Sequence, residues 1–223
     1  MNRQDAKAPR KMVLFYLGEL GALAVKIELM QTNQNETEIK LPISDLEQTI
    51  NQVRKLDVKI LTERHLEDNF LFDHNEGFLA KERMLLRLRI MASPEPPFKE
   101  WKAILTFKGV PEVSDGVKKR EEIESELNES DNFKLILLKL GFEITFRYQK
   151  YRTVYRMQNA GLDICIDETP IGNFLELEGE ILRIHEVATQ LGYNRDDYIT
   201  QSYATLYYRW CQKMGSTEPY MVF

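Results

Sequence analysis

Alternating polar and apolar residues predict that most of this chain forms β-strands. The first such segment is residues 36–40, where an extended strand would place Glu36, Glu38 and Lys40 on one side and Thr37 with Ile39 on the other. The same alternation recurs in residues 85–90, 101–108, 117–126, 142–157, 162–167 and 174–180. Two apolar runs, 58–62 and 69–73, indicate one bent strand or a pair of strands. Each alternating segment carries a line of charges along one face.

Four segments instead show apolar residues at helical spacing, namely 44–55, 131–140, 181–191 and 196–210. Ser44 followed by Glu47 has the spacing of a capping box, so Ser44 is the predicted N-cap of the first helix. Gly141 and Gly192 end the second and third. The chain is therefore predicted to be α+β and mainly β.

The charged strand faces allow two architectures. In one, an open sheet buries its apolar face and displays its charges to water. In the other, the sheet closes into a β-barrel with a charged interior, and the predicted helices cover its apolar outside. Such an interior is tenable when cations and anions compensate one another or a charged ligand enters.

Length, composition and net charge limit the number of domains and the class of protein. The 223 residues and the absence of a linker favour a single domain over 30–215, with a tail at 216–223 and an N-terminal extension at 1–29. Charged residues interrupt the apolar run at 12–30, so neither a signal peptide nor a membrane span is favoured. The net charge of −5 argues against a general nucleic-acid surface. Cys165 and Cys211 have no metal or redox spacing and fit the cytoplasm.

The two signs of charge on the strand faces suggest a ligand. The basic side chains form a cradle for a polyanion, with arginine forks suited to phosphate oxygens: Lys40, Arg87, Arg89, Lys108, Arg120, Lys150 and Arg152. The acidic ones would need hard divalent cations to approach phosphate: Glu36, Glu38, Glu122, Glu124, Asp167, Glu176 and Glu178. His65 and His74, with no partner histidine at ligand spacing, are expected in loops or on the surface.

In this order the motifs resemble the CYTH superfamily of triphosphate tunnel metalloenzymes, from Glu36 to about Tyr203. Glu36-x-Glu38-x-Lys40 is similar to the family's signature Glu-x-Glu-x-Lys. The motifs that follow in the family's order are Arg87-x-Arg89, Thr106-x-Lys108-Gly109, Arg120-x-Glu122-x-Glu124, Lys150-x-Arg152, Asp167 and Glu176-x-Glu178. The resemblance implies an eight-stranded antiparallel closed β-barrel, the triphosphate tunnel.

The resemblance also implies residue roles. Glu36, Glu38, Asp167, Glu176 and Glu178 would bind Mg²⁺ or Mn²⁺, with Glu122 and Glu124 as further candidates. The seven basic residues would bind the triphosphate, and Lys40 could instead help to orient the attacking water or hydroxyl, which places Lys40, Glu36 and Glu38 at the chemistry. Tyr198, Ser202 and Tyr203 lie in a segment that closes one tunnel mouth, where a packing role is expected. Relatives suggest a homodimer.

Family members include triphosphatases and class IV adenylyl cyclases, so the fold does not choose between them. A cyclase needs an adenine pocket and a base for the ribose 3′-hydroxyl, and neither is identifiable from the sequence. Metal-dependent hydrolysis of a triphosphate small molecule is therefore expected, with conversion of ATP to cyclic AMP and pyrophosphate as the alternative. A non-catalytic polyphosphate-binding or nucleotide-binding protein, and a purely structural β-domain, also remain open. No nucleic-acid or membrane partner is expected.

Overall fold

The strands and helices follow the predicted order closely. The computed structural model describes residues 34–159 and 161–223, so the predicted N-terminal extension at 1–29 lies outside the described residues. The strands are β1 (Gln34–Ile43), β2 (Val58–His74), β3 (Leu85–Ala92), β4 (Glu100–Lys108), β5 (Glu112–Ser114), β6 (Val117–Leu127), β7 (Phe142–Met157), β8 (Asp163–Thr169) and β9 (Gly172–Glu178). The helices are α1 (Leu46–Val53), α2 (Phe78–Lys81), α3 (Ser130–Lys139), α4 (Ile181–Gln190) and α5 (Tyr203–Met214).

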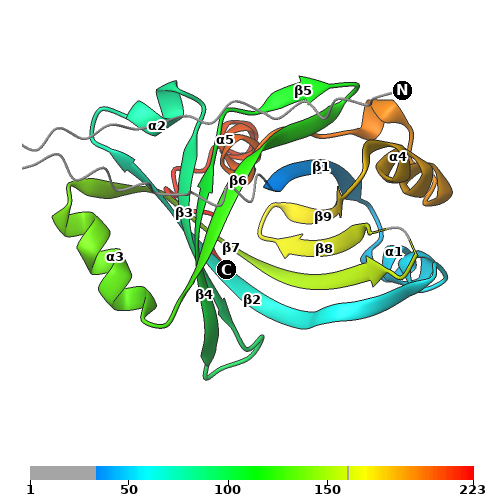
Figure 1. The fold of residues 1–223 in the computed structure, drawn as a ribbon, viewed down its shortest axis with the longest axis horizontal. Coiled ribbons are helices and arrows are strands. Elements are labelled where there is room, and N and C mark those ends of the chain that lie inside the picture. The colour runs from blue at the N-terminus through cyan, green and yellow to red at the C-terminus, as the bar shows by residue number, and fades with distance from the viewer. Residues whose placement is uncertain (1–33, 160) are drawn as a thin grey trace, which may run out of the picture. The chain divides into compact units, whose positions relative to one another are not determined.

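Eight of the strands close into a ring (Figure 1). The order is β1-β9-β8-β7-β2-β3-β4-β6, every pairing is antiparallel, and β6 returns to β1 through the register Glu36↔Arg120. The predicted eight-stranded antiparallel barrel is thereby confirmed. The short strand β5 was not predicted; it pairs with β6 alone and lies outside the ring.

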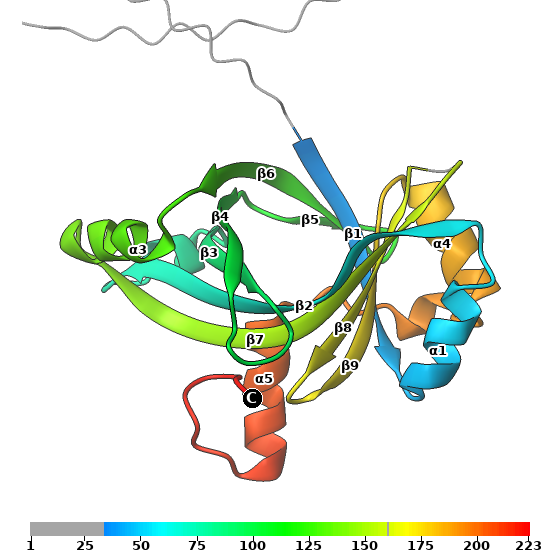
Figure 2. The ribbon, with the colours of Figure 1, turned by 90° about the horizontal axis from the view of Figure 1, so that it is seen from below.

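The helices lie outside the ring (Figures 1 and 2), where they cover apolar outer faces of the strands. Ile184, Val187 and Ala188 of α4 and Val53 of α1 pack against the outer faces of β1, β8 and β9. On another side, Leu137 of α3 packs against β2, β3 and β4. Among the described residues, no helix is long and apolar enough to cross a bilayer.

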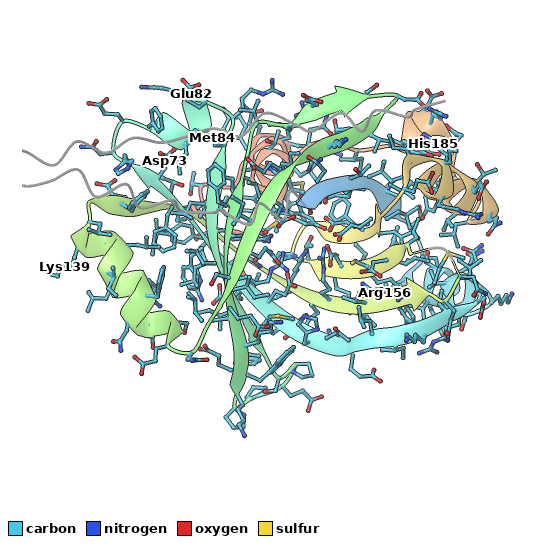
Figure 3. All side chains as sticks on the ribbon, in the orientation of Figure 1. Asp73, Glu82, Met84, Lys139, Arg156 and His185 are labelled. Carbon is cyan, nitrogen blue, oxygen red and sulfur yellow. The ribbon has the colours of Figure 1, made fainter. Side chains whose placement is uncertain are left out.

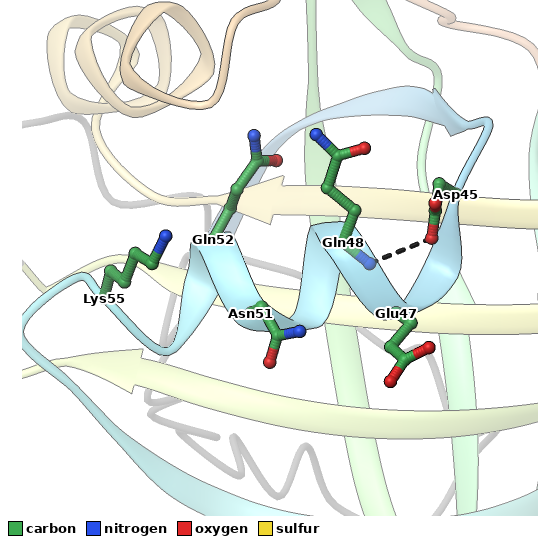
Figure 4. Close-up of a pocket in the computed structure, with 6 residues that line it drawn as sticks. All are labelled: Asp45, Glu47, Gln48, Asn51, Gln52 and Lys55. Carbon is green, nitrogen blue, oxygen red and sulfur yellow. Dashed lines mark hydrogen bonds between the residues drawn. The ribbon is translucent and has the colours of Figure 1, made fainter.

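Helix α1 begins one residue later than predicted. Asp45, not Ser44, is the N-cap, because the backbone is extended at Asp45 and its Oδ1 accepts a hydrogen bond of 2.9 Å from the Gln48 N–H (Figure 4). The polar side chains of this helix line a shallow hollow in Figure 4: Asp45, Glu47, Gln48, Asn51, Gln52 and Lys55. This hollow lies on the solvent-exposed side of α1, and no residue of the strand ring lines it.

The C-terminal segment attaches to the ring at two free strand edges. The predicted helix at 196–210 is wrong at its start: Arg195–Asp197 is a 3-10 turn, and α5 begins at Tyr203 after the N-cap Ser202. Between them Ile199 forms a β-bridge to Lys40, on the part of β1 that β6 does not reach. Met221, in the segment expected to be a tail, is fully buried and bridges to Tyr148, where β7 has no pairing with β8.

Candidate functional site

Charged side chains fill the inner face of the ring and pair with one another (Figure 3). Eight are basic: Lys40, Arg87, Arg89, Lys108, Lys118, Arg120, Lys150 and Arg152. Eight are acidic: Glu36, Glu38, Glu67, Glu122, Glu124, Asp167, Glu176 and Glu178. Alternation places them there because the residues between them carry the apolar outer face. The interior network is balanced in formal charge.

The deepest part of the network is organised around Asp167 of β8. Its Oδ1 accepts a hydrogen bond of 2.6 Å from Arg152 Nε, and its Oδ2 accepts from Arg152 Nη2 at 2.7 Å and from Lys150 Nζ at 2.8 Å. The hydroxyl of Tyr203 in α5 donates to the same oxygen at 2.6 Å. Lys40 Nζ donates to Glu176 Oε1 at 2.5 Å, and Arg152 donates to the other oxygen of Glu176. The carboxylates here already have cationic partners.

The two ends of the ring differ in access. At the end where β8 turns into β9, helix α5 lies beside the ring (Figure 2). The aromatic side chains of Tyr203 and Tyr207 in α5 pack there against Tyr148 and Phe174. At the opposite end, the side chains of Glu178 and Glu124 keep 30% and 38% of their surface in water, against 2% for Lys150. A ligand would therefore enter from the end that carries Glu124 and Glu178.

Three carboxylates converge near this open end. Oxygens of Glu36, Glu38 and Glu178 lie within 4.8 Å of one another, because β1 pairs with β9 in the register Glu38↔Glu178. Burial and the neighbouring carboxylates raise the pKa of Glu178 to about 8. Burial and Glu38 also raise the pKa of Glu36, although Lys108 opposes them. Glu38 differs: burial alone would raise its pKa, but Lys118, Lys40 and Lys108 together hold it below the ordinary value.

The chemistry of this cluster fits a hard divalent cation. All three residues offer carboxylate oxygens, which are the donors that Mg²⁺ and Mn²⁺ prefer, and there is no sulfur or imidazole donor in the cluster. Burial is the main cause of the raised pKa of Glu178, and a bound cation would relieve the repulsion between carboxylates that adds to it. Glu36, Glu38 and Glu178 are therefore the residues best placed to hold a metal ion.

Every predicted site residue lies on the inner network, but the acids divide into groups. Glu36, Glu38 and Glu178 form the convergent cluster, whereas Asp167 and Glu176 are bound to Lys40, Lys150 and Arg152. Glu122 approaches Lys108 Nζ at 3.1 Å, and Glu124 accepts 2.8 Å from the Thr106 hydroxyl. The seven predicted phosphate-binding residues each contact at least one of these or the other inner carboxylates.

Two inner residues were missed by the sequence analysis: Glu67 and Asn69 of β2 are fully buried in the interior. Lys118, on the alternating segment 117–126 but not among the predicted binding residues, pairs with Glu38. The expectation that His65 lies in a loop or on the surface is wrong: it is a buried residue within β2, with its ring toward Glu67. Tyr203, expected only to pack, also hydrogen-bonds to Asp167. The apolar outer positions Leu66, Phe70 and Phe72 carried the signal for Glu67 and Asn69.

The CYTH domain profile matches residues 34–203, which is most of the chain and includes every strand of the ring. The chain is a member of the CYTH family. A Methanocaldococcus jannaschii protein named "putative adenylate cyclase" is 28% identical over 182 residues, which cover 77% of this chain and 97% of that one.

Solved structures share the CYTH fold. A "putative adenylate cyclase" from Vibrio parahaemolyticus superposes with a TM-score of 0.67 at 19% identity, covering 79% of this chain and 99% of that one. A Hippeastrum protein, described as a putative adenylyl cyclase with a dominant triphosphatase activity, has a TM-score of 0.56 at 20% identity, with coverages of 83% and 97%. At these identities the likeness establishes the fold.

Proposed function

We propose that this CYTH protein is a metal-dependent enzyme that hydrolyses a triphosphate and releases phosphate. The observation that carries the proposal is the convergence of Glu36, Glu38 and Glu178 beside lysines and arginines on the inner face of the strand ring. Carboxylates that gather a divalent cation, facing cations that bind phosphate oxygens, are the two parts that phosphoryl transfer needs. Family membership supports the same reading.

The basic residues would bind and orient the triphosphate. Arg87, Arg89, Lys108, Arg120, Lys150 and Arg152, with Lys40, offer donors from five different strands, so the phosphate chain would be held from several sides. Ion pairs with the inner carboxylates hold these donors inside the ring before the ligand arrives, and on binding each would exchange a carboxylate partner for phosphate oxygens. Lys40, whose Nζ donates to Glu176 and whose backbone bridges to Ile199, would instead help to orient the attacking water.

The acidic residues would hold Mg²⁺ or Mn²⁺. Glu36, Glu38 and Glu178 are the proposed primary ligands, with Asp167, Glu176, Glu122 and Glu124 as further candidates that would first have to leave their cationic partners. When bound, the cation supplies Lewis-acid stabilisation of phosphoryl charge. The two ligands would belong together, since triphosphate alone would bring its negative charge beside eight inner carboxyl groups and a divalent cation would offset part of it.

Metal binding is expected to release protons. At pH 7, Glu178, whose pKa is about 8, is mostly protonated and must lose roughly one proton when it ligates a cation. The affinity for Mg²⁺ should therefore rise with pH and level off above about 8. Titration calorimetry with Mg²⁺ in buffers of different ionisation enthalpy measures the released proton. Glu178→Gln is expected to remove the release, and an unchanged release in that variant would assign the proton to another group.

A product assay decides between hydrolysis and the alternatives. Purified protein would be offered tripolyphosphate, ATP and thiamine triphosphate in turn, each with Mg²⁺ or Mn²⁺. Metal-dependent release of orthophosphate is the expected result. Cyclic AMP with pyrophosphate from ATP would instead make the protein a class IV adenylyl cyclase, the activity for which the Methanocaldococcus relative is named. Metal-dependent binding without any turnover would make it a polyphosphate-binding or nucleotide-binding protein.

The cellular compartment and the oligomeric state of the protein can also be proposed. Among the described residues, Cys165 and Cys211 are both free thiols, in keeping with a reducing cytoplasm. We propose that the protein acts there on a small triphosphate without a nucleic-acid partner, and that it forms a homodimer. Sedimentation of the purified protein across a concentration series would measure the mass of the assembly.

A further inference from the structure

Glu67 is a buried carboxylate that the proposed reaction does not use. It faces the interior from β2, its side chain keeps 1% of its surface in water, and three positively charged or titratable groups surround it. Arg89 Nε lies 3.4 Å and Lys150 Nζ 3.5 Å from Oε2, and His65 Nε2 lies 3.6 Å from Oε1. Burial would raise the pKa of Glu67, but Arg89, Lys150 and Arg152 together hold it well below the ordinary value, so the group is ionised.

Two of these neighbours are proposed triphosphate-binding residues. Arg89 and Lys150 approach Glu67 without forming a hydrogen bond to its Oε2, which has no hydrogen-bond partner. Phosphate oxygens would give both cations shorter, better-aligned contacts. As Arg89 and Lys150 turn to the phosphate, Glu67 loses its compensating charge while it stays out of water, and an uncompensated buried carboxylate is strongly unfavourable.

His65 is built to supply the missing charge. Its Nδ1 lies 2.8 Å from the carbonyl oxygen of Glu63, which can only accept, so Nδ1 carries a proton and Nε2 is the atom that titrates. Nε2 is buried, has no hydrogen-bond partner and faces Glu67. Trp101 of β4 covers the ring edge-on, with the ring centroids 5.7 Å apart. The residue opposite on β7 is Arg152, which is engaged with Asp167 and Glu176.

We propose that His65 and Glu67 couple triphosphate binding to the uptake of one proton. Before binding, Glu67 positions Arg89 and Lys150 in the tunnel. When the triphosphate draws these cations away, His65 Nε2 takes a proton from solvent and the imidazolium pairs with Glu67. Both are positioning residues, and they act on the ligand through Arg89 and Lys150. This coupling rests on the proposed triphosphate binding, and it adds a proton-linked step to it.

The imidazole resonances of the protein provide a direct test, because the chain contains three histidines. The probe is a non-hydrolysable tripolyphosphate with nitrogen bridges, added with Mg²⁺, and each histidine is titrated by NMR with and without it. The pKa of His65 is expected to rise by about one unit on binding. The ligand should then bind about tenfold more tightly at a pH below the titration of His65 than at a pH above it. His65→Gln assigns the resonance and should abolish this pH dependence of KM with less effect on kcat.

Glu67→Gln separates coupling from a structural effect. This nearly isosteric variant keeps the ring of His65 in place but removes the charge that it would balance, so the rise in the His65 pKa should vanish. His74 lies on the same strand but stacks on Phe142, and its titration should not respond to the ligand.

Three outcomes would overturn the coupling. One is ligand binding that leaves His65 unchanged, and another is an equal rise of the His65 pKa in Glu67→Gln. If the ligand changes nothing in the spectrum, the protein does not bind triphosphate, and the proposed function fails together with the coupling.

Discussion

Exchange of Glu36 or Glu38 for glutamine is expected to lower the rate of triphosphate turnover by about a thousandfold, while the protein stays folded. Each residue supplies an oxygen to the convergent cluster with Glu178, and an uncharged amide binds a hard cation much more weakly. A loss of about 4 kcal/mol of transition-state stabilisation corresponds to this factor. Steady-state phosphate release as a function of Mg²⁺ concentration measures it, and circular dichroism verifies the fold.

The matched control is Glu112→Gln. Glu112 is an exposed glutamate on β5, outside the ring, so the same chemical change should leave rate and metal dependence as they are. Full activity of Glu36→Gln and Glu38→Gln with the original Mg²⁺ requirement would exclude the cluster from the reaction and return the charged interior to a structural role.

The largest effect on stability is expected for Asp167→Asn. Asp167 is fully buried and compensates Lys150 and Arg152, so loss of its charge leaves two buried cations with fewer partners. Breaking a buried ion pair from one side costs about 3–5 kcal/mol. Urea unfolding in buffer without divalent cations measures the difference, which under these conditions reports ion pairing and not loss of a metal ligand.

A matched pair on the same two strands provides the comparison. Arg156 and Asp163 also join β7 to β8 with two hydrogen bonds of 2.6 Å each, but their side chains keep 46% and 21% of their surface in water (Arg156 is labelled in Figure 3). Asp163→Asn should therefore cost less than about 1 kcal/mol. Equal losses for the two variants would show that burial of the Asp167 network does not determine its contribution.

Strand alternation made most of the site predictable. In residues 36–40 of β1 and 86–90 of β3 charged residues alternate with uncharged, mostly apolar ones, so Glu36, Glu38, Lys40, Arg87 and Arg89 could be assigned to one face before the ring was known. The family motifs then supplied the number of strands. No local pattern predicts β5, which is three exposed residues held by pairing with β6 alone.

Strand β2 shows why inner and outer residues could not always be assigned from the sequence. Charges occupy both of its faces around Glu67: Asp68 points outward and binds Arg147 of β7 with hydrogen bonds of 2.9 and 2.6 Å. Register shifts between Ile60 and His65 also break the period of two, so counting along the chain gives the wrong face. His65 could be placed inside only once the partner strands were known, whereas for Glu67 the charges on both faces obscured the signal from Leu66, Phe70 and Phe72.

The sequence could not show which of the inner carboxylates lie close enough together to share a metal ion. Glu36, Glu38 and Glu178 converge because β1 and β9 are neighbours in a given register, and sequence spacing carries no trace of that register. The same holds for Tyr203, whose hydroxyl reaches Asp167 and whose ring lies 4.6 Å from Lys40 Nζ because α5 closes one end of the ring. A helix position alone does not show which strand it will meet.

The partners of β1 have a consequence for how the chain folds. This strand completes the ring between β6 and β9, and its contacts join residues 84 apart in Arg120–Glu36 and 136 apart in Lys40–Glu176. Contacts of such long sequence separation form slowly because much chain entropy is lost before they stabilise the structure. Until β1 docks, the inner faces of its neighbours remain hydrated. The buried charges of the inner face therefore leave water together in the step that closes the ring, whereas Glu124 and Glu178 stay partly hydrated at its open end.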